Sequence, residues 1–521
     1  METIKTNETK KVQLGLFILG SILFNWFFWK EELGLNLLLY NIFIIGTLSI
    51  IYPKSIKEKR TLLMVSACTI TALMVFFYGS TISKVTNLTS LLIFIGYVHQ
   101  PQIKSIFFAG FTSILNFFRF PIKQIFKSLN KNNTSESAVI TSLKKIKLVV
   151  IPLIFLFIFY WIFKAANPKF DIITKELGDK ISILFEWLFS DISWIRIPFF
   201  LFGCIIIAAF IYHENITLYL NKEIGFKDII KRKRKKRVVL SENEKRMFQP
   251  KVFPLSIGLK NEYRSAIILV GMVNLLLFFI NYLDVSWLWF DFEYKKDLNL
   301  SQFVHEGTYL LILSILLSMG IILYFFRRNL NFLPKNKLIK QLSILWIFQN
   351  MILVISVGLR NFYYIQEYGL AYKRIGVIVF LLLTLIGLIT LIFKITKLKS
   401  AFCLIKINSI AVYSSFIFLS LFNWDIIIAN HNLSNLKSRK VDVTFLLTLS
   451  ENTLPLIDKH SAILDTKGVR YQGGNHHFTF NWKVQHFLEK QKDHSWLSMN
   501  LSKLKTIEYF NNTNTFYYEN K

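Results

Sequence analysis

Long apolar segments alternate with short polar connectors over most of this chain of 521 residues. A helix that crosses a lipid bilayer needs roughly 20 mostly apolar residues, and in lipid the backbone must satisfy its own hydrogen bonds. The pattern therefore predicts an all-α fold, a polytopic transmembrane helix bundle of about 11 spans (range roughly 10–12). The predicted spans are residues 12–29, 33–52, 61–78, 85–99, 147–164, 193–213, 264–283, 305–325, 341–359, 375–394 and 404–422.

The apolar segment 103–128 is interpreted differently because of the charge around it. Residues 100–147 carry eight basic side chains and a single acidic one, Glu136. Lys and Arg accumulate in cytoplasmic connectors close to the ends of spans. We therefore expect 100–147 to be a basic cytoplasmic loop. Within it, 103–128 is predicted to form an amphipathic or re-entrant helix on the inner leaflet, with its Phe-rich face in lipid.

The chain becomes polar after the last predicted span. We divide it into a polytopic membrane domain at 1–422 and a polar, mostly helical C-terminal appendage at 423–521. Residues 441–457 and 495–510 have helical apolar spacing, and 470–482 has the composition of a turn with short extended pieces. Because the first basic connector predicts a cytoplasmic N-terminus and the number of spans is odd, we expect the appendage outside the cell.

Composition supports a membrane protein and limits the role of the basic runs. Of all residues, 53% are hydrophobic and 18% are charged, against about 25% charged in soluble proteins. The net charge of +30 falls in connectors such as the basic cytoplasmic loop 214–263, which contains the run KRKRKKR. Attraction to anionic headgroups contributes about 1 kcal/mol per basic residue near the surface. A nucleic-acid interface would need a DNA- or RNA-binding fold, and this loop is too short to supply one.

We therefore assign the run to contact with anionic lipid and expect no nucleic-acid partner. Its residues are Lys231, Arg232, Lys233, Arg234, Lys235, Lys236 and Arg237.

The sequence contains no P-loop, GxGxxG, GxSxG or HExxH pattern. The three cysteines lie in apolar runs. Four histidines of the C-terminal appendage, His476, His477, His486 and His494, match no standard metal spacing. We expect no catalytic residue, no metal and no cofactor. A membrane-embedded enzyme therefore ranks third among the function classes.

Polar side chains at membrane depth or at span ends are the candidates for binding a substrate or partner, because each is costly in lipid. Gln349 and Asn350 either line a substrate path or form interhelical hydrogen bonds. His305 and Glu306 either sense pH and transfer protons or simply begin a helix. The connector 360–374 either binds anionic headgroups and phosphorylated substrates or anchors the chain at the interface. The candidates are His305, Glu306, Gln349, Asn350, Arg360, Glu367, Tyr368 and Arg374.

Several short motifs resemble a known family. They are Phe303–Tyr309 at the start of a span, Tyr368–Arg374 in a connector, and Asn423–Asp425, Asn432–Leu433 and Asp442–Ser450 after the last span. In this order they resemble the multi-pass bacterial membrane family catalogued as domain of unknown function 4173. The chain has Ala371 where that family commonly has Thr. The resemblance implies a bacterial cytoplasmic membrane and many spans, and it brings no activity.

The leading hypothesis is a non-enzymatic sensor, regulator or assembly component of a bacterial inner membrane. Its expected partners are anionic lipid headgroups and a membrane or periplasmic protein that contacts the appendage or the basic loop. The alternative is a transporter or lipid-handling protein with a site at the outer ends of the spans near 305 and 360–374.

Overall fold

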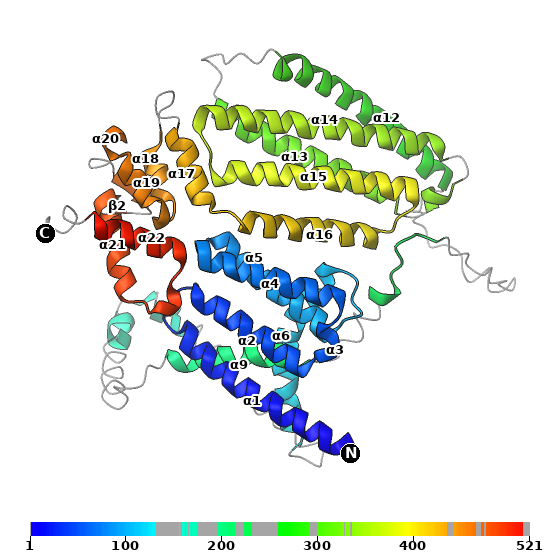
Figure 1. The fold of residues 1–521 in the computed structure, drawn as a ribbon. Helices are drawn as coiled ribbons and strands as arrows, with labels where there is room; N and C mark the ends of the chain where they lie inside the picture. Colours follow the sequence, from blue (N-terminus) through cyan, green and yellow to red (C-terminus); the bar gives the residue numbers. More distant parts are fainter. Residues whose placement is uncertain are drawn as a thin grey trace, which may run out of the picture.

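A computed structural model gives the architecture as a set of long helices that run side by side, with a small domain at one end (Figure 1). The residues described are 2–131, isolated positions between 156 and 175, 195–213, 223–231, 259–290, 300–327, 329–333, 336–434, 441–464, 470–473 and 476–513. The predicted span 147–164 lies outside them apart from isolated positions, and so does most of the loop 214–263.

The first group of helices surrounds one apolar core. It consists of α1 (Glu2–Phe28), α2 (Leu35–Ile51), α3 (Pro53–Ile56), α4 (Lys59–Tyr78), α5 (Thr81–His99), α6 (Ile106–Lys131) and α9 (Arg196–Ile211). Leu48, Cys68 and Phe94 are fully buried in this core. Asn41 donates to Asn87 at 3.0 Å, and Asn87 donates to the Cys68 carbonyl at 3.1 Å. These hydrogen bonds join α2 and α4 to α5, and they satisfy the buried side-chain amides within the protein.

The second group is built around α14. It consists of α12 (Leu259–Asp284), the π-helical turn η1 (Val285–Trp289), α13 (Leu300–Phe325), the turn η2 (Asn329–Phe332), α14 (Lys337–Tyr368), α15 (Tyr372–Lys397) and α16 (Ala401–Ser420). Its core includes the fully buried Trp346, Leu353 and Leu388. The two groups meet where α16 packs on α5, and there the Tyr413 hydroxyl donates to Ser90 Oγ at 2.8 Å.

Helix α6 crosses the other helices obliquely at the end of the bundle that carries the N-terminus (Figure 1). Phe107, Phe111, Ile114 and Phe118 are exposed and form one stripe, whereas Asn116 on the opposite side is buried. The Asn116 side-chain amide donates to two carbonyls at the C-terminal end of α9, those of Ala209 at 2.8 Å and of the capping residue Tyr212 at 3.0 Å. An apolar exposed face with a polar buried face is the arrangement expected of a helix in lipid.

The C-terminal domain is a compact set of short elements. They are α17 (Trp424–Ser434), α18 (Val443–Thr448), η3 (Glu451–Thr453), α19 (Leu454–Lys459), α20 (Ser461–Leu464), β1 (Arg470–Gly473), β2 (His476–Thr479), α21 (Phe480–Lys492), η4 (Trp496–Ser498) and α22 (Leu501–Asn512). The strands pair antiparallel, with Tyr471 opposite Phe478, which confirms the predicted extended pieces within 470–482. The core of this domain includes Ile375 and Leu419 from α15 and α16. The domain therefore shares its core with the ends of those helices.

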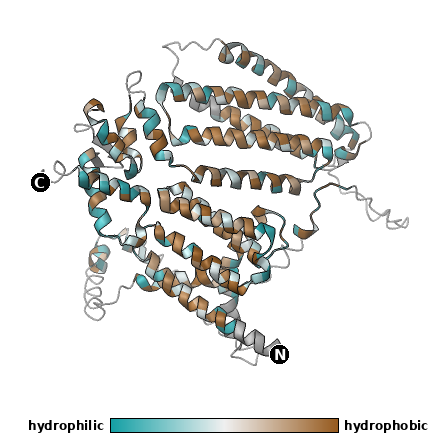
Figure 2. Cartoon of the chain, in the orientation of Figure 1, coloured by the Kyte–Doolittle hydropathy of each residue, from teal (hydrophilic) through white to brown (hydrophobic). Residues whose placement is uncertain are grey.

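The polarity of the surface follows this division. Figure 2 shows hydrophobic residues along the long helices of both groups and more hydrophilic ones in α21 and α22. In the part of the chain that the structure describes, seven helices are long and apolar enough to cross a membrane. Four further apolar helices are shorter, namely Leu35–Ile51, Ile106–Pro121, Arg196–Ile211 and Tyr309–Phe325. The polytopic helical bundle is confirmed, while the predicted number of about 11 spans is not established.

Candidate functional site

The C-terminal domain contacts three turns of the bundle, and the first of them joins α1 to α2. Both carboxylate oxygens of Glu31 accept from the Ser495 backbone N–H at 3.2 Å, and Glu31 also accepts from the Ser498 hydroxyl. The Leu35 N–H donates to the Met499 carbonyl at 3.0 Å. A Cβ at Gly34 would lie 2.6 Å from the carbonyl oxygens of Ser498 and Met499, so only glycine allows this approach.

A charge cluster forms beside this turn. Glu32 accepts from Lys490 at 2.6 Å and also from Lys503, and the His494 ring lies 3.8 Å from the same carboxylate. Burial would raise the pKa of Glu32, but the hydrogen bonds and charges of the two lysines outweigh it and lower the pKa to about 2. The hydrogen bond to Glu32 in turn raises the pKa of Lys490. Glu32 and Lys490 are therefore both ionised over the physiological pH range.

The second contacted turn joins α4 to α5. The Ser502 hydroxyl donates to the Phe77 carbonyl at 2.9 Å, and the Asn452 amide donates to the Tyr78 carbonyl at 3.3 Å. Both acceptors belong to the last turn of α4, where carbonyls lack partners within the helix. The C-terminal domain thus satisfies backbone groups that the helix end leaves open.

The third contacted turn joins α14 to α15. Gly369 has a φ of 79°, which an L side chain rarely adopts, and a Cβ there would lie 2.4 Å from Asn432 Oδ1. Asn432 of α17 accepts from the Leu370 N–H at 2.7 Å and donates to the Leu370 carbonyl at 3.0 Å. Arg374 donates to the carbonyls of Tyr368, at 2.8 Å, and Gly369. These two side chains fix the turn from both sides.

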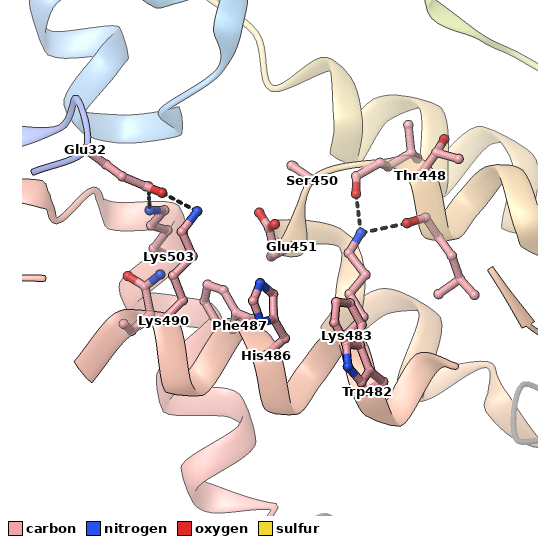
Figure 3. Close-up of a pocket in the computed structure, with 13 residues that line it drawn as sticks. Glu32, Thr448, Ser450, Glu451, Trp482, Lys483, His486, Phe487, Lys490 and Lys503 are labelled. Carbon is pink, nitrogen blue, oxygen red and sulfur yellow. Dashed lines mark hydrogen bonds and ion pairs between the residues drawn. The ribbon is translucent and has the colours of Figure 1, made fainter. Parts of the chain in front are cut away.

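A cavity of about 440 Å³ lies between the C-terminal domain and the α1–α2 turn (Figure 3). On one side it has Glu32 and its two lysines, and on the other Lys483, which donates to the carbonyls of Leu447 at 2.7 Å and Leu449 at 2.5 Å. The rings of Trp482 and His486 also line the cavity and stack with their centres 4.8 Å apart. Glu451 also lines the cavity.

On the α18 side of this cavity, the charge of Lys483 is held inside the protein. Burial lowers the pKa of Lys483, and the negative charges of Glu451 and Asp425 oppose that shift. Its ammonium group closes the end of α18 by bonding two carbonyls, so it is engaged in structure. Across the described ranges, no group of three or more His, Cys, Asp or Glu side chains is placed to hold a metal ion.

Most of 360–374 belongs to the helices α14 and α15, so the prediction of a long connector is wrong, and Arg360 and Arg374 have partners inside the protein. Arg360 forms a buried ion pair with Asp284 of α12 at 2.6 Å. The Arg374 guanidinium lies 4.3 Å from the centre of the Tyr364 ring, in addition to its bonds to the turn. The Tyr368 ring lies 4.8 Å from the Tyr364 ring, tilted by 49°, and Tyr368 is 48% exposed. Glu367 is exposed as well.

The other predicted residues lie elsewhere. Asn350 is fully buried and donates to the Trp346 carbonyl at 2.8 Å, and the backbone carbonyl of Gln349 accepts from Asn281 at 3.0 Å. His305 and Glu306 belong to α13, but their side chains are outside the described part of the chain. Lys231 is exposed, whereas Arg232, Lys233, Arg234, Lys235, Lys236 and Arg237 fall outside the described residues.

Sequence reasoning missed the acidic residues that organise the bundle end. Glu31 and Glu32 are adjacent acids in a very short connector of a strongly basic chain, and that is the signal that could have found them. Asp284 directly follows the predicted span 264–283, so it was counted with the polar connector. The structure places it in the last residue of α12, where it is buried.

Comparison with known families finds a match over residues 37–460 to the domain of unknown function DUF4153. The short motifs were assigned to domain of unknown function 4173, which is a different family number, so that assignment is corrected to DUF4153. Its implication of a multi-pass protein of unknown activity is compatible with the match. Searches of curated proteins and of solved structures found no match. Since the match covers most of its length, this membrane protein belongs to the DUF4153 family.

Proposed function

We propose that the protein is a non-enzymatic sensor or regulator of a bacterial inner membrane, in which the C-terminal domain couples to the positions of the spans. One observation carries this proposal. The domain bonds to three turns, and these turns connect six helices drawn from both helix groups. A shift of any of these helices would change contacts of the domain, which is what a coupled sensing element requires.

The distribution of basic residues along the chain supports the sides of the membrane and the partners in this proposal. We place the N-terminus and the basic connectors in the cytoplasm, where Lys231–Arg237 contact anionic headgroups. The C-terminal domain then lies on the opposite side of the membrane, and its polar cavity and exposed helices would receive a membrane or periplasmic protein.

The proposal is tested by releasing the domain without removing it. Gly34→Leu introduces a side chain against the backbone of Ser498 and Met499, so it should separate the domain from the α1–α2 turn. Gly15→Leu is the matched control, because a Cβ at Gly15 meets no atom within 4 Å. Full-length variants are extracted in native-membrane nanodiscs and their stoichiometric protein partners are identified by mass spectrometry.

A regulator should retain one defined protein in the wild type and in Gly15→Leu and lose it in Gly34→Leu. Equal retention by all three variants would show that docking of the domain does not control the partner. Hydrogen exchange of α12 and α13 in Gly34→Leu provides the folding control, because these helices belong to the other helix group and the core of the C-terminal domain includes residues of α15 and α16 instead.

Transport or lipid handling through the outer ends of the spans near 305 and 360–374 is the second candidate. It requires Arg360 and Arg374 to release their internal partners when a substrate binds. Gln349→Leu should then abolish solute flux in reconstituted vesicles without changing expression, and unchanged flux would argue against this function.

A further inference from the structure

A second cavity, of about 550 Å³, lies among α1, α2, α5, α6 and α9. Its walls are formed by apolar side chains such as Phe24, Leu91, Phe117 and Ile206. Two polar side chains, Glu31 and Tyr40, also line it, and both are engaged inside the protein. The Glu31 carboxylate accepts from Ser495 and Ser498, and the Tyr40 hydroxyl donates to the Gly20 carbonyl at 3.1 Å. Apolar cavities of this kind exclude water and accept hydrocarbon.

This cavity opens on the face of the bundle that lipid covers. Leu88, Ile114 and Phe202 line the cavity and are also 47%, 43% and 50% exposed. They belong to three different apolar helices, α5, α6 and α9. Since the exposed faces of helices that cross a membrane contact acyl chains, a chain can pass from the bilayer into the cavity without crossing a polar region.

Positive charge lies beside the cavity at the end nearest the C-terminal domain. Phe199 lines the cavity and packs on Trp29 at 5.3 Å between ring centres. The exposed guanidinium of Arg196 lies 5.8 Å from the centre of the Trp29 ring, and the exposed Lys30 follows Trp29 in the chain. Tryptophan with arginine is typical of the headgroup level of a membrane, and both cations can bind phosphate.

We propose that this cavity binds a phospholipid of the surrounding bilayer, with one acyl chain among α1, α5, α6 and α9 and its phosphate beside Arg196 and Lys30. The acyl chain gains little hydrophobic free energy on leaving the bilayer, so packing contacts and the charge of the headgroup supply the preference. The site therefore favours an anionic headgroup. This inference goes beyond the regulatory role and does not depend on it.

The test uses the full-length protein in nanodiscs of phosphatidylethanolamine and phosphatidylglycerol, with a phosphatidylglycerol that carries a photoactivatable diazirine on one acyl chain. Peptide mass spectrometry locates the crosslinks. Crosslinks in the wild type should concentrate on the peptides of α5, α6 and α9 that contain Leu88, Ile114 and Phe202. They should also decrease when unlabelled phosphatidylglycerol is added.

Two adjacent positions of α9 supply the matched variants. Ile206→Trp fills the cavity, whereas Ile205 is exposed and does not line it, so Ile205→Trp adds the same ring on the lipid side. Ile206→Trp should lower cavity crosslinking about tenfold, or about 1.4 kcal/mol of binding free energy, because the indole ring occupies the volume that the acyl chain would fill. Ile205→Trp should leave it unchanged.

The headgroup is tested separately, so a folding defect of Ile206→Trp does not decide the result. Unlabelled phosphatidylglycerol should compete with the labelled lipid better than unlabelled phosphatidylethanolamine does. Arg196→Gln should reduce this difference while the crosslinked peptides stay the same. The proposal is overturned if Ile206→Trp crosslinks as the wild type does. It is also overturned if the label spreads evenly over exposed helix faces such as Leu275 and Phe278 of α12, which would show bulk lipid alone.

Discussion

Glu32 holds the C-terminal domain through charge, because it is the carboxylate that both Lys490 and Lys503 contact. Lys503 is largely buried, so it depends on this carboxylate to compensate its charge. A buried or partly buried charge that loses its partner costs more than the intact pair contributes. The main effect of Glu32 is therefore to avoid the cost of burying the lysine charges without a partner, and the net attraction of the ion pairs contributes less.

Glu32→Gln should destabilise the docked domain by about 1–3 kcal/mol, because it leaves the Lys503 ammonium without a charged acceptor. Thermal unfolding of the purified protein in detergent and hydrogen exchange of α21 and α22 measure this loss. Glu489→Gln, an exposed residue on α21, is the control and should leave both unchanged. Equal protection of α22 in the two variants would contradict the role of the pair.

The same carboxylate predicts a pH dependence. Its pKa is about 2 in the folded protein and 4.5 ordinarily, so the folded state holds fewer protons on this group than the unfolded state. Its stabilising contribution is therefore complete above 4.5 and is lost as the pH falls from 4.5 toward 2. Protection of α22 should decrease over this range in the wild type, and Glu32→Gln should lack that part of the decrease.

At the level of residues, the sequence could indicate polar candidates but not their partners. Arg374 was a candidate for an anionic ligand, and the structure places its guanidinium on Tyr364 and on the carbonyls of the turn. Asn432 was noted only as part of a motif, and it bonds both backbone groups of Leu370, 62 positions away in the chain. Contacts at such separations depend on the packing of whole helices, which local spacing does not specify.

Among the elements, α12 and α14 form the most regular pair. They run parallel, since Asn274 donates to the Leu342 carbonyl and Asn281 donates to the Gln349 carbonyl. Both the donors and the acceptors are seven residues apart, which is the spacing of a left-handed helix pair. The ion pair of Asp284 with Arg360 extends the contact between the two helices toward their C-terminal ends.

Asp284→Asn should destabilise the α12–α14 pair by about 3–5 kcal/mol, because it leaves the buried Arg360 charge uncompensated. The double variant Asp284→Asn with Arg360→Met should recover part of that loss, since it removes the charge as well. Thermal unfolding in detergent measures both. Glu367→Gln, on the exposed part of the same helix, is the control, and a double variant less stable than the single one would refute the pairing argument.

Helix α6 gives a second prediction at this scale. Asn116→Leu removes both hydrogen bonds to the end of α9 and leaves the carbonyls of Ala209 and Tyr212 without these donors, so hydrogen exchange of α6 and α9 should increase. Phe118→Leu changes an exposed apolar residue two positions away and should have no such effect. Unchanged exchange in Asn116→Leu would mean that apolar packing alone positions α6.

Charge and periodicity together predicted most elements, because a span is a local property of about 20 residues. The predicted 85–99 begins four residues late, since Ser80 caps α5 and the polar first turn of that helix hides its start. The predicted 264–283 is also shorter than α12, which begins at Leu259. Hydropathy marks only the apolar part of a helix, so polar ends in contact with other elements are missed.

The whole molecule has two chemically different ends. The N-terminus lies at one end, and the C-terminal domain lies at the other (Figure 1). Helix ends and connectors contact one another at the N-terminal end. Arg60 of α4 donates to the Ile103 carbonyl at 2.7 Å, and Lys406 of α16 pairs with Asp228 at 2.9 Å. This end carries the predicted basic connectors, whereas the opposite end carries the acidic pair Glu31 and Glu32.

This polarity predicts the sides of the membrane on which two engineered cysteines react. Positive connectors favour the cytoplasm, so Lys57→Cys, between α3 and α4, should be cytoplasmic and Lys492→Cys, at the end of α21, should be external. Both positions are exposed, and Cys68 and Cys403 are buried, so Cys204→Ala provides a suitable background. In sealed right-side-out vesicles, a membrane-impermeant maleimide should label Lys492→Cys and reach Lys57→Cys only after detergent is added. Labelling of both without detergent would contradict the opposite placement of the two ends, and the reverse pattern would invert the orientation while leaving the fold intact.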